Sequence, residues 1–475
     1  MTGRCGIIGL AFGLLILMAG CMRVGPDYRP PKIDTPSDWS IRLDGTAEPN
    51  MLERWWMLFD DPILFQLIER ARANNLDLRQ AMARVRQARA QLLIAKGALL
   101  PTMGASGSAR RTRTKIDDMD ARTSSLYSVG LDASWELDIF GGNRRAIEAA
   151  VATYQARQES LKDVLVSLCA EVGLNYIDLR LNQQLLAITE SNLQTRMQTY
   201  QITSWRLEAG LTTELDVEQA RLSLEQARAQ IPSIQVNIRQ TMHRIAVLVA
   251  EQPSALDEIL ASPRPVPSAP AALAAGLPAD LLRRRPDVRA AERNLAAQTA
   301  QIGVVKASLY PSLSLMGGAA LESISIGDLL DGTRTIQGAL NSAWTIFDAG
   351  AIRQNVEIQK ARQQEALASY QAAVLAALRD VEDALVTYTN EQDHTSSLEL
   401  AAGSAQRAFE LALDQYNSGL VGFQTVLDMQ QSLLTIQEQL ARSKANITSS
   451  LISLYKALGG GWSQTDGESD GQHSD

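Results

Sequence analysis

The chain has 475 residues and a formal net charge of −8, from 45 Lys and Arg against 53 Asp and Glu. A chain this acidic, without a block of clustered basic residues, is not typical of nucleic-acid-binding proteins. Its three Cys exclude a disulfide-rich scaffold, and its three His lie too far apart in sequence to suggest a metal site, so we expect neither a metal nor another cofactor.

The N-terminus has the pattern of a secretory signal. Residues 6–17 are all apolar or glycine, a run too short to span a membrane, and small residues follow it up to Cys21. The sequence LMAGC at residues 17–21 resembles a bacterial lipobox, in which the Cys becomes the lipidated first residue of the mature chain. We therefore expect residues 1–20 to be a signal peptide and Cys21 to carry lipid. An ordinary signal peptide, cut near Ala19, is the alternative.

Proline divides the rest of the chain. All sixteen prolines lie at or before Pro311, and none lies within residues 102–231, where long helices can therefore run. Residues 21–60 are predicted to be a lipid-anchored N-terminal segment, and the proline-rich residues 253–286 an extended linker. Residues 459–475 are rich in Gly, Ser, Asp and Gln and are predicted to be a disordered tail.

The two halves of the chain are related by an internal duplication. Residues 77–101 and 287–311 align at an offset of 210 with eight identities in 25 positions, and at an offset of 209 Trp135 pairs with Trp344. We therefore expect two copies of one structural repeat, at residues 61–252 and 287–458.

Each copy contains a predicted β-hairpin. Apolar and polar residues alternate along residues 127–138 and 335–346, the period of a strand with one apolar and one polar face. Partner strands are predicted in front of them, at residues 102–109 and 312–321. Polar loops are predicted between the strands, at residues 110–124 and 322–334.

A long helix hairpin is predicted after each β-hairpin. Residues 141–208 and 350–416 contain no proline and are rich in helix-forming residues, which favours helices of about 67 residues, or ~100 Å. The chain is predicted to turn at Gly210-Leu211 and at Gly419-Leu420, where glycine favours a helix end. Within the first long helix, Cys169 occupies a seam position and is predicted to be a core residue.

The returning helices carry a strict seven-residue apolar repeat, which predicts a left-handed coiled coil. Pro232 interrupts the first of them and is expected to kink it. The repeat consists of Val217, Leu224, Ile231, Ile238 and Ile245 in the first copy and of Val426, Leu433, Leu440, Ile447 and Leu454 in the second.

Four strands with alternating faces cannot close a barrel alone, and open strand edges cannot face lipid, so an outer-membrane location requires several chains to share one barrel. Three copies would give twelve strands and a lumen. Trp135 and Trp344 lie near strand ends, where aromatic side chains suit the membrane interface, although ordinary strand packing is an alternative.

Four stretches resemble a known family. Residues 277–315, LPADLLRRRPDVRAAERNLAAQTAQIGVVKASLYPSLSL, are similar to the signature of NodT-type outer-membrane efflux lipoproteins within the TolC-like family, and residues 25–31, 60–81 and 135–145 match as well. The resemblance implies a mainly α fold with a pair of membrane β-hairpins: a trimeric, twelve-stranded β-barrel continued by a long α-helical coiled-coil barrel, in the Gram-negative outer membrane.

The resemblance also implies a function. Such proteins are the outer-membrane ducts of tripartite efflux pumps, in which a homotrimer in outer-membrane lipid docks onto a periplasmic adaptor and an inner-membrane transporter of the RND type and exports drugs or other small molecules. Two alternatives stay open: a duct for type I protein secretion, and a coiled-coil envelope lipoprotein without a channel. The chain lacks a GxSxG elbow and a phosphate-binding loop, so we expect no enzyme activity.

Members of this family close the periplasmic end by twisting the helix hairpins inward. By residue match, Asp216 and Asp428 stand where acidic aperture residues are expected, and Tyr416 where a linking tyrosine is found. Val421 replaces a linking Arg of other members. Alternatively, Asp216 and Asp428 are charges that stabilise the N-terminus of a helix. Tyr416 would then be an ordinary residue of the seam between helices.

Overall fold

The computed structural model describes residues 23–34, 36–41, 52–117, 120–268 and 284–463. The predicted signal peptide and Cys21 lie outside the described residues, as do residues 269–283 of the predicted linker and residues 464–475 of the predicted tail. The described chain forms two compact units, and each draws on both halves of the sequence. Among the described residues, unit 1 contains those within 23–33, 84–158 and 290–372, and unit 2 contains those within 34–83, 159–289 and 373–463.

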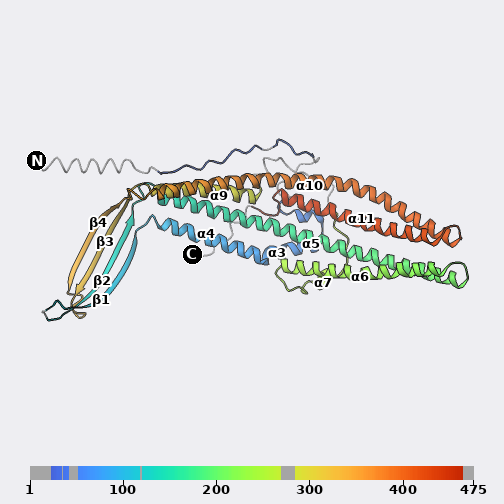
Figure 1. Ribbon diagram of the computed structural model, residues 1–475, viewed down its shortest axis with the longest axis horizontal. Coiled ribbons are helices and arrows are strands. Elements are labelled where there is room, and N and C mark those ends of the chain that lie inside the picture. The colour runs from blue at the N-terminus through green and yellow to red at the C-terminus, as the bar shows by residue number, and fades with distance from the viewer. Residues whose placement is uncertain (1–22, 35, 42–51, 118–119, 269–283, 464–475) are drawn as a thin grey trace. The chain divides into compact units, whose positions relative to one another are not determined.

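The four longest helices form two helix hairpins (Figure 1). Helices α5 (Gly142–Glu208) and α10 (Ala351–Asn417) each have 67 residues, and their ends lie within one residue of the predicted ones. Helices α6 (Glu214–Leu248) and α11 (Phe423–Ala457) return with 35 residues each. Helix α6 continues through Pro232 without a break, so the kink expected there stays a prediction.

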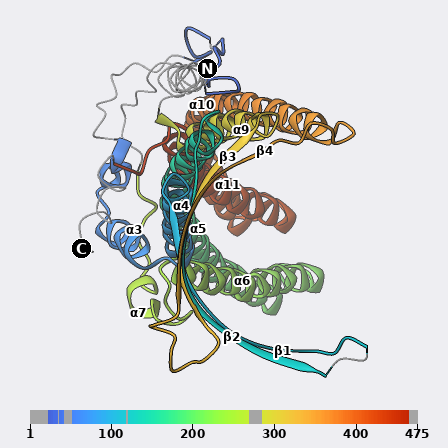
Figure 2. The same ribbon diagram turned by 90° about the vertical axis from the view of Figure 1, so that its left-hand side faces the viewer.

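Unit 1 contains an antiparallel sheet in the order β1-β2-β3-β4 (Figures 1 and 2). Strands β2 and β3 pair across the two repeats, with Trp135 opposite Leu315, so both hairpins belong to one sheet. The strands are β1 (Thr102–Thr114), β2 (Arg122–Glu136), β3 (Ser312–Ser323) and β4 (Thr333–Ala343).

The predicted loops between the strands were too long. Strand β1 continues through Arg110, Arg111 and Arg113, which the sequence analysis assigned to a loop, and β2 begins at Arg122. Every residue of β1 is exposed in the single chain, so a charged side chain does not have to be buried there. Polarity therefore does not mark the end of such a strand.

Two equivalent helices of 22 residues precede the β-hairpins: α4 (Leu76–Gly97) leads into β1, and α9 (Pro286–Ala307) leads into β3. Their equal lengths agree with the duplication in the sequence. No helix in the described part of the chain combines the length and apolar character needed to cross a bilayer.

The core of unit 2 is built around tryptophans that the N-terminal segment supplies. Trp55 and Trp56, in the 3-10 helix η1 (Trp55–Phe59), are fully buried, and Trp55 stacks on Tyr455 of α11 with ring centroids 5.9 Å apart. Cys169 of α5 is also fully buried, which confirms its predicted place in the core. Two shorter helices, α3 (Pro62–Asn74) and α7 (Asp257–Leu260), complete the unit.

The predicted disordered tail began too early. Gly459–Trp462 are buried, the Gly461 amide donates to the Leu52 carbonyl over 2.8 Å, and Lys162 lies 4.6 Å from the Trp462 ring. Gly459 and Gly461 have φ values of 71° and 100°, which other residues rarely adopt. These glycines permit a tight path through the core, so the prediction that they mark a flexible tail was wrong.

Candidate functional site

The two helix hairpins turn in the same way. At the end of α5, the Gly210 and Leu211 amides donate to the carbonyls of Leu207 and Arg206, and the Gly419 and Leu420 amides repeat the pattern at the end of α10. Gly210 and Gly419 have φ values of 71° and 75°, and apart from the adjoining backbone no atom lies within 4 Å of a Cβ built on either. Both turns are therefore Schellman motifs that need glycine for its backbone conformation alone.

Asp216 stabilises the start of α6. It forms a capping box with Thr213: its Oδ2 accepts from the Thr213 amide at 3.1 Å and from the Thr212 hydroxyl at 2.6 Å, and its own amide donates to the Thr213 hydroxyl. Burial, the largest single influence, raises the pKa of Asp216, but these hydrogen bonds together outweigh it and leave the pKa below its usual value. The carboxylate therefore stays charged at neutral pH.

Asp428 has a different environment. It is exposed in the second turn of α11, and its Oδ1 accepts from the Gln424 side chain at 2.7 Å. At an offset of 209, Thr425 corresponds to Asp216, so the two acids are not equivalent between the repeats. Asp216 has a structural task at a helix end, whereas Asp428 has no capping role in the described structure.

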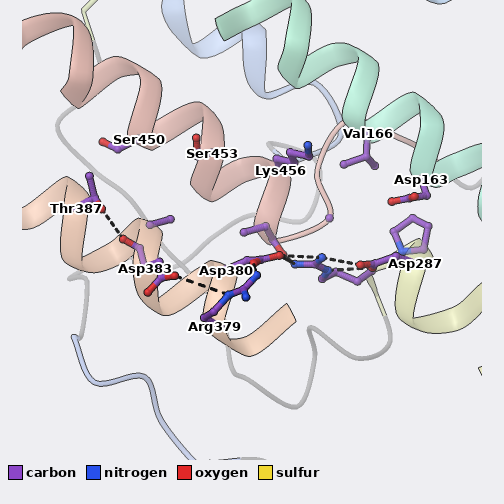
Figure 3. Close-up of a pocket in the computed structure, with 15 residues that line it drawn as sticks. Asp163, Val166, Asp287, Arg379, Asp380, Asp383, Thr387, Ser450, Ser453 and Lys456 are labelled. Atoms are coloured by element: carbon purple, nitrogen blue, oxygen red, sulfur yellow. Dashed lines mark hydrogen bonds and ion pairs between the residues drawn. The ribbon is translucent and has the colours of Figure 1, made fainter. Parts of the chain in front are cut away.

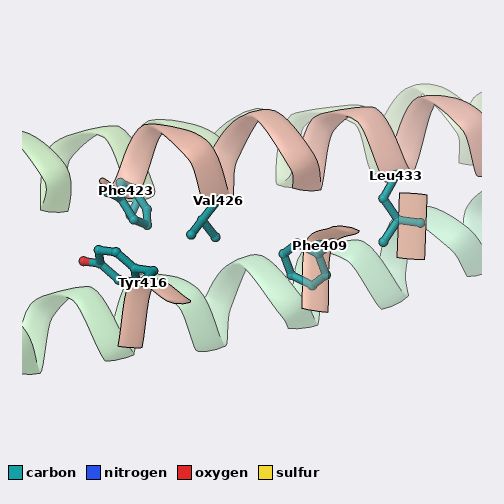
Figure 4. Close-up of a cluster of buried hydrophobic side chains, with 6 residues drawn as sticks. Phe409, Tyr416, Phe423, Val426 and Leu433 are labelled. Carbon is teal, nitrogen blue, oxygen red and sulfur yellow. The ribbon is translucent and has the colours of Figure 1, made fainter. Parts of the chain in front are cut away.

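Tyr416 is buried at the seam between α10 and α11 (Figure 4). Only 4% of it is exposed, and its ring lies 5.3 Å from that of Phe423. Its hydroxyl has no hydrogen-bond partner among the residues that the structure describes. Val421 packs against the same cluster, which consists of Ala220, Phe409, Tyr416, Phe423, Val426 and Leu433.

Arg206 joins the two hairpins near their tips. Its guanidinium lies 4.6 Å from the Tyr416 ring, and its Nη1 donates to the carbonyl of Asn417, the last residue of α10, over 3.0 Å. A cation is favourable at this end of a helix because the last carbonyls carry partial negative charge. The sequence alone does not indicate this role of Arg206, because nothing local marks a contact across 211 positions.

Arg196 makes a second link, farther from the tips, that the sequence analysis also missed. It is 5% exposed, and it donates from Nη1 to the Ser223 hydroxyl on α6 at 2.7 Å and from Nη2 to the Gln431 side chain on α11 at 3.0 Å. Burial lowers the pKa of Arg196, but an arginine remains charged in a protein. A single cation thus connects three helices of unit 2.

The two tryptophans predicted for a membrane interface have equivalent contacts in unit 1. The indole of Trp135 donates to the Leu99 carbonyl at 2.9 Å, and the indole of Trp344 donates to the Leu309 carbonyl at 3.1 Å. Both rings are partly exposed, at 38% and 57%. Each hydrogen bond joins the end of a β-hairpin to the turn that precedes its first strand. The sequence did not indicate this additional role.

A polar pocket of about 570 Å³ lies in unit 2 (Figure 3). Arg285 binds Asp287, Asp380 and the Ala457 carbonyl, so it joins the start of α9 to α10 and α11. Burial raises the pKa of the nearby Asp163, and Asp287 raises it further. No group of metal-ligating side chains occurs among residues 23–463 as far as they are described.

The sequence pattern of the family described as "Outer membrane efflux protein" matches residues 67–251 and 277–460, one match for each repeat. The chain belongs to this family. Solvent efflux pump outer membrane protein SrpC of Pseudomonas putida is 33% identical over 94% of the chain and 97% of its own length. Nodulation protein T of Rhizobium leguminosarum bv. trifolii is 32% identical over 94% of the chain and 96% of its own length.

The fold also resembles that of a solved outer-membrane channel. The outer-membrane channel OprN superposes with a TM-score of 0.86 at 34% identity, over 93% of the chain and all of OprN. These likenesses confirm the predicted family, the TolC-like fold with its internal repeat, and the outer-membrane location. They describe a family of efflux channels and not of enzymes.

Proposed function

We propose that this protein is the exit duct of a tripartite efflux pump, which carries drugs or other small molecules across the outer membrane to the cell exterior. One observation carries the proposal: a protein named as part of a solvent efflux pump matches the chain over 94% of its length. The fold of a known outer-membrane channel supports it. A duct needs no catalytic residue and no cofactor, and we assign none.

The sheet supports a homotrimer. Strands β1 and β4 are its outer strands in the described chain, and an unpaired strand edge is not tolerated in lipid. Pairing β1 of one copy with β4 of the next would close the sheet, and three copies would give a twelve-stranded barrel. We propose that this trimer docks onto a periplasmic adaptor protein and receives its substrate from an inner-membrane transporter of the RND type.

The same proposal assigns the remaining segments. Residues 61–252 and 287–458 would be the two repeats, and residues 253–286 the linker between them. Cys21 would hold lipid in the outer membrane, and Trp135 and Trp344 would lie at the membrane interface.

We propose that the duct opens at the helix tips. Arg206 and Arg196 bind from the first hairpin to the second, so these bonds have to break or shift when the hairpins separate. Asp216 and Asp428 would line the aperture, and Tyr416 would link hairpins in the closed state. With Val421 in place of an arginine, closure would depend on packing around Tyr416 and on the Arg206 contact.

Electrical recording tests the duct. Purified protein added to a planar lipid bilayer is expected to give discrete current steps, with detergent alone as the control. A protein that only tethers envelope layers would give none, and that result would reject the proposal.

Deletion of the gene in the host distinguishes the two kinds of cargo. Loss of an efflux duct is expected to increase the retention of small apolar dyes while the amounts of secreted proteins stay the same. The opposite pattern would favour type I protein secretion and contradict the efflux proposal.

A further inference from the structure

Arg145, in the first turn of α5, is buried although it is an arginine: only 1% of its side chain is exposed. Its partners are chiefly on residues 24–27. Its Nε donates to the Val24 carbonyl at 3.1 Å, and its Nη2 donates to the Gly25 carbonyl at 3.3 Å and to Asp27 Oδ1 at 2.7 Å. Its Nη1 donates to Glu148 at 2.7 Å. Most of its hydrogen-bonding capacity is thus directed at a segment about 120 residues away in sequence.

Glycines let this segment approach closely. Gly25 has a φ of 98°, and a Cβ added to it would lie 2.5 Å from the Cα of Gly303 in α9. A Cβ on Gly303 would lie 2.7 Å from Cγ of Arg145, and one on Gly141 would lie 3.0 Å from the Cα of Arg23. No larger residue fits these positions without a backbone shift, so residues 23–27 are held by shape as well as by charge.

The docked segment lies where strands become helices. The Val24 amide donates to the Phe140 carbonyl at 3.2 Å, and Phe140 belongs to the connection from β2 to α5. The Phe140 ring stacks on Tyr310, in the connection from α9 to β3, with centroids 4.7 Å apart. Residues 23–27 therefore contact the junction between the sheet and the helices of unit 1.

We propose that Arg145, Gly141 and Gly303 form a docking site for the chain's own residues 23–27, which Gly25 allows to approach closely, and that this site places the lipid of Cys21 beside the base of the sheet. Two residues of chain span at most ~7 Å, so the position of Arg23 limits the reach of a lipid on Cys21. The inference rests on the proposed lipoprotein duct. On this inference, the lipid positions the base of the sheet at the membrane surface that its acyl chains enter.

Electrostatics supports a contact that persists at neutral pH. The hydrogen bond and the charge of Arg145 hold the pKa of Asp27 below its usual value, although the Asp27 side chain is 81% exposed. Asp27 therefore remains ionised at the pH of the periplasm. The ion pair fixes one end of residues 23–27 while the glycines fix the middle.

Trypsin tests the docking. The Arg23–Val24 bond is a trypsin site, and release of the N-terminal peptide from the full-length protein can be followed by mass spectrometry. Asp27→Ala removes an exposed side chain whose described bond is to Arg145, so it should leave the fold intact, and Gly25→Ala disturbs the same segment through shape. Loss of one charged hydrogen bond corresponds to about tenfold faster release.

Matched controls are Asp34→Ala, which makes the same charge change at an exposed residue, and Gly97→Ala, since nothing lies within 4 Å of a Cβ at Gly97. Both should release the peptide at the wild-type rate. Equal rates for all five proteins would overturn the docking site.

The second experiment tests the placement of the lipid. Chemical cross-linking in outer membranes quantifies the oligomer for wild type, Asp27→Ala and Gly25→Ala, each with Cys21 and with Cys21→Ser behind an ordinary signal peptide. The variants are expected to lower the oligomer severalfold only when Cys21 carries lipid. If the variants lower the amount of oligomer equally with and without lipid, the docking site only stabilises the fold. That result would overturn the proposed placement of the lipid.

Absence of lipid on wild-type Cys21 would also overturn the placement, together with the lipoprotein assignment. The trypsin result does not depend on lipid or transport, so it separates a failure of the docking site from a failure of the proposed function.

Discussion

At the scale of single residues, two buried tyrosines of unit 2 differ in what their hydroxyl groups contact. The Tyr176 hydroxyl donates to Asp61 at 2.6 Å, whereas the Tyr416 hydroxyl has no hydrogen-bond partner among the described residues. Burial raises the pKa of Tyr176, and the bond to Asp61 raises it further, so this phenol stays protonated and continues to donate.

We expect substitution by Phe to affect the stability of the protein differently at the two tyrosines. Tyr176→Phe should destabilise the protein by about 1–2 kcal/mol, because Oδ2 of the half-buried Asp61 loses a charge-assisted hydrogen bond while Oδ1 keeps the Ile63 and Leu64 amides. Tyr416→Phe should be neutral or stabilising. Thermal unfolding followed by circular dichroism measures both. A similar loss of stability for Tyr416→Phe would mean that its hydroxyl has a partner in the assembled protein.

A residue-scale prediction also concerns the gate. Arg206→Ala removes the contact with the Tyr416 ring and the bond to the Asn417 carbonyl. If these contacts hold the proposed closed state, that state should lose about 1–2 kcal/mol and single-channel conductance should rise. Arg228→Ala is a suitable control, because Arg228 is more than half exposed and pairs with Glu225 on its own helix. Unchanged conductance in Arg206→Ala would exclude it from the gate.

At the scale of elements, the tips depend on backbone conformation at two glycines. Gly210→Ala and Gly419→Ala should each cost about 1 kcal/mol, because the left-handed conformation disfavours a Cβ although space is free. Gly403→Ala, inside α10 with only the flexible end of Arg407 nearby, should stabilise the helix by up to ~1 kcal/mol.

Hydrogen exchange at the tips and thermal unfolding measure these effects. The substitutions at the two turns should lower the stability, whereas the substitution at Gly403 should raise it. Stabilisation by all three substitutions would contradict the assignment of the turns.

The elements also show which parts of the fold a sequence can predict. The ends of α5 and α10 were predicted within one residue, because absence of proline and the turn glycines are local signals. The extent of β1 was not, since its arginines are exposed and carry no burial pattern.

Among the site residues, the acids and the tyrosine came from a family resemblance, whereas Arg206, Arg196 and Arg145 were missed. Their contacts join segments more than 100 residues apart in sequence, as between Arg145 and Asp27. One sequence holds no record of such pairs. The buried glycines of residues 459–461 were misinterpreted for the same reason, because composition alone does not separate flexibility from close packing.

At the scale of the whole molecule, the central claim is that one chain is a third of a duct. The described sheet ends in β1 and β4, and the exposed apolar side chains of its strands, such as Val129, Leu131 and Ile336, lack cover in the single chain. Lipid and neighbouring copies would provide that cover. The structure of the assembled protein therefore tests the claim most directly.

That measurement is electron cryo-microscopy of the full-length protein extracted from outer membranes. We expect hollow particles with threefold symmetry, in which each copy contributes four strands to one barrel and two helix hairpins to one tunnel. Single copies with a closed sheet, or solid rods without a lumen, would contradict it.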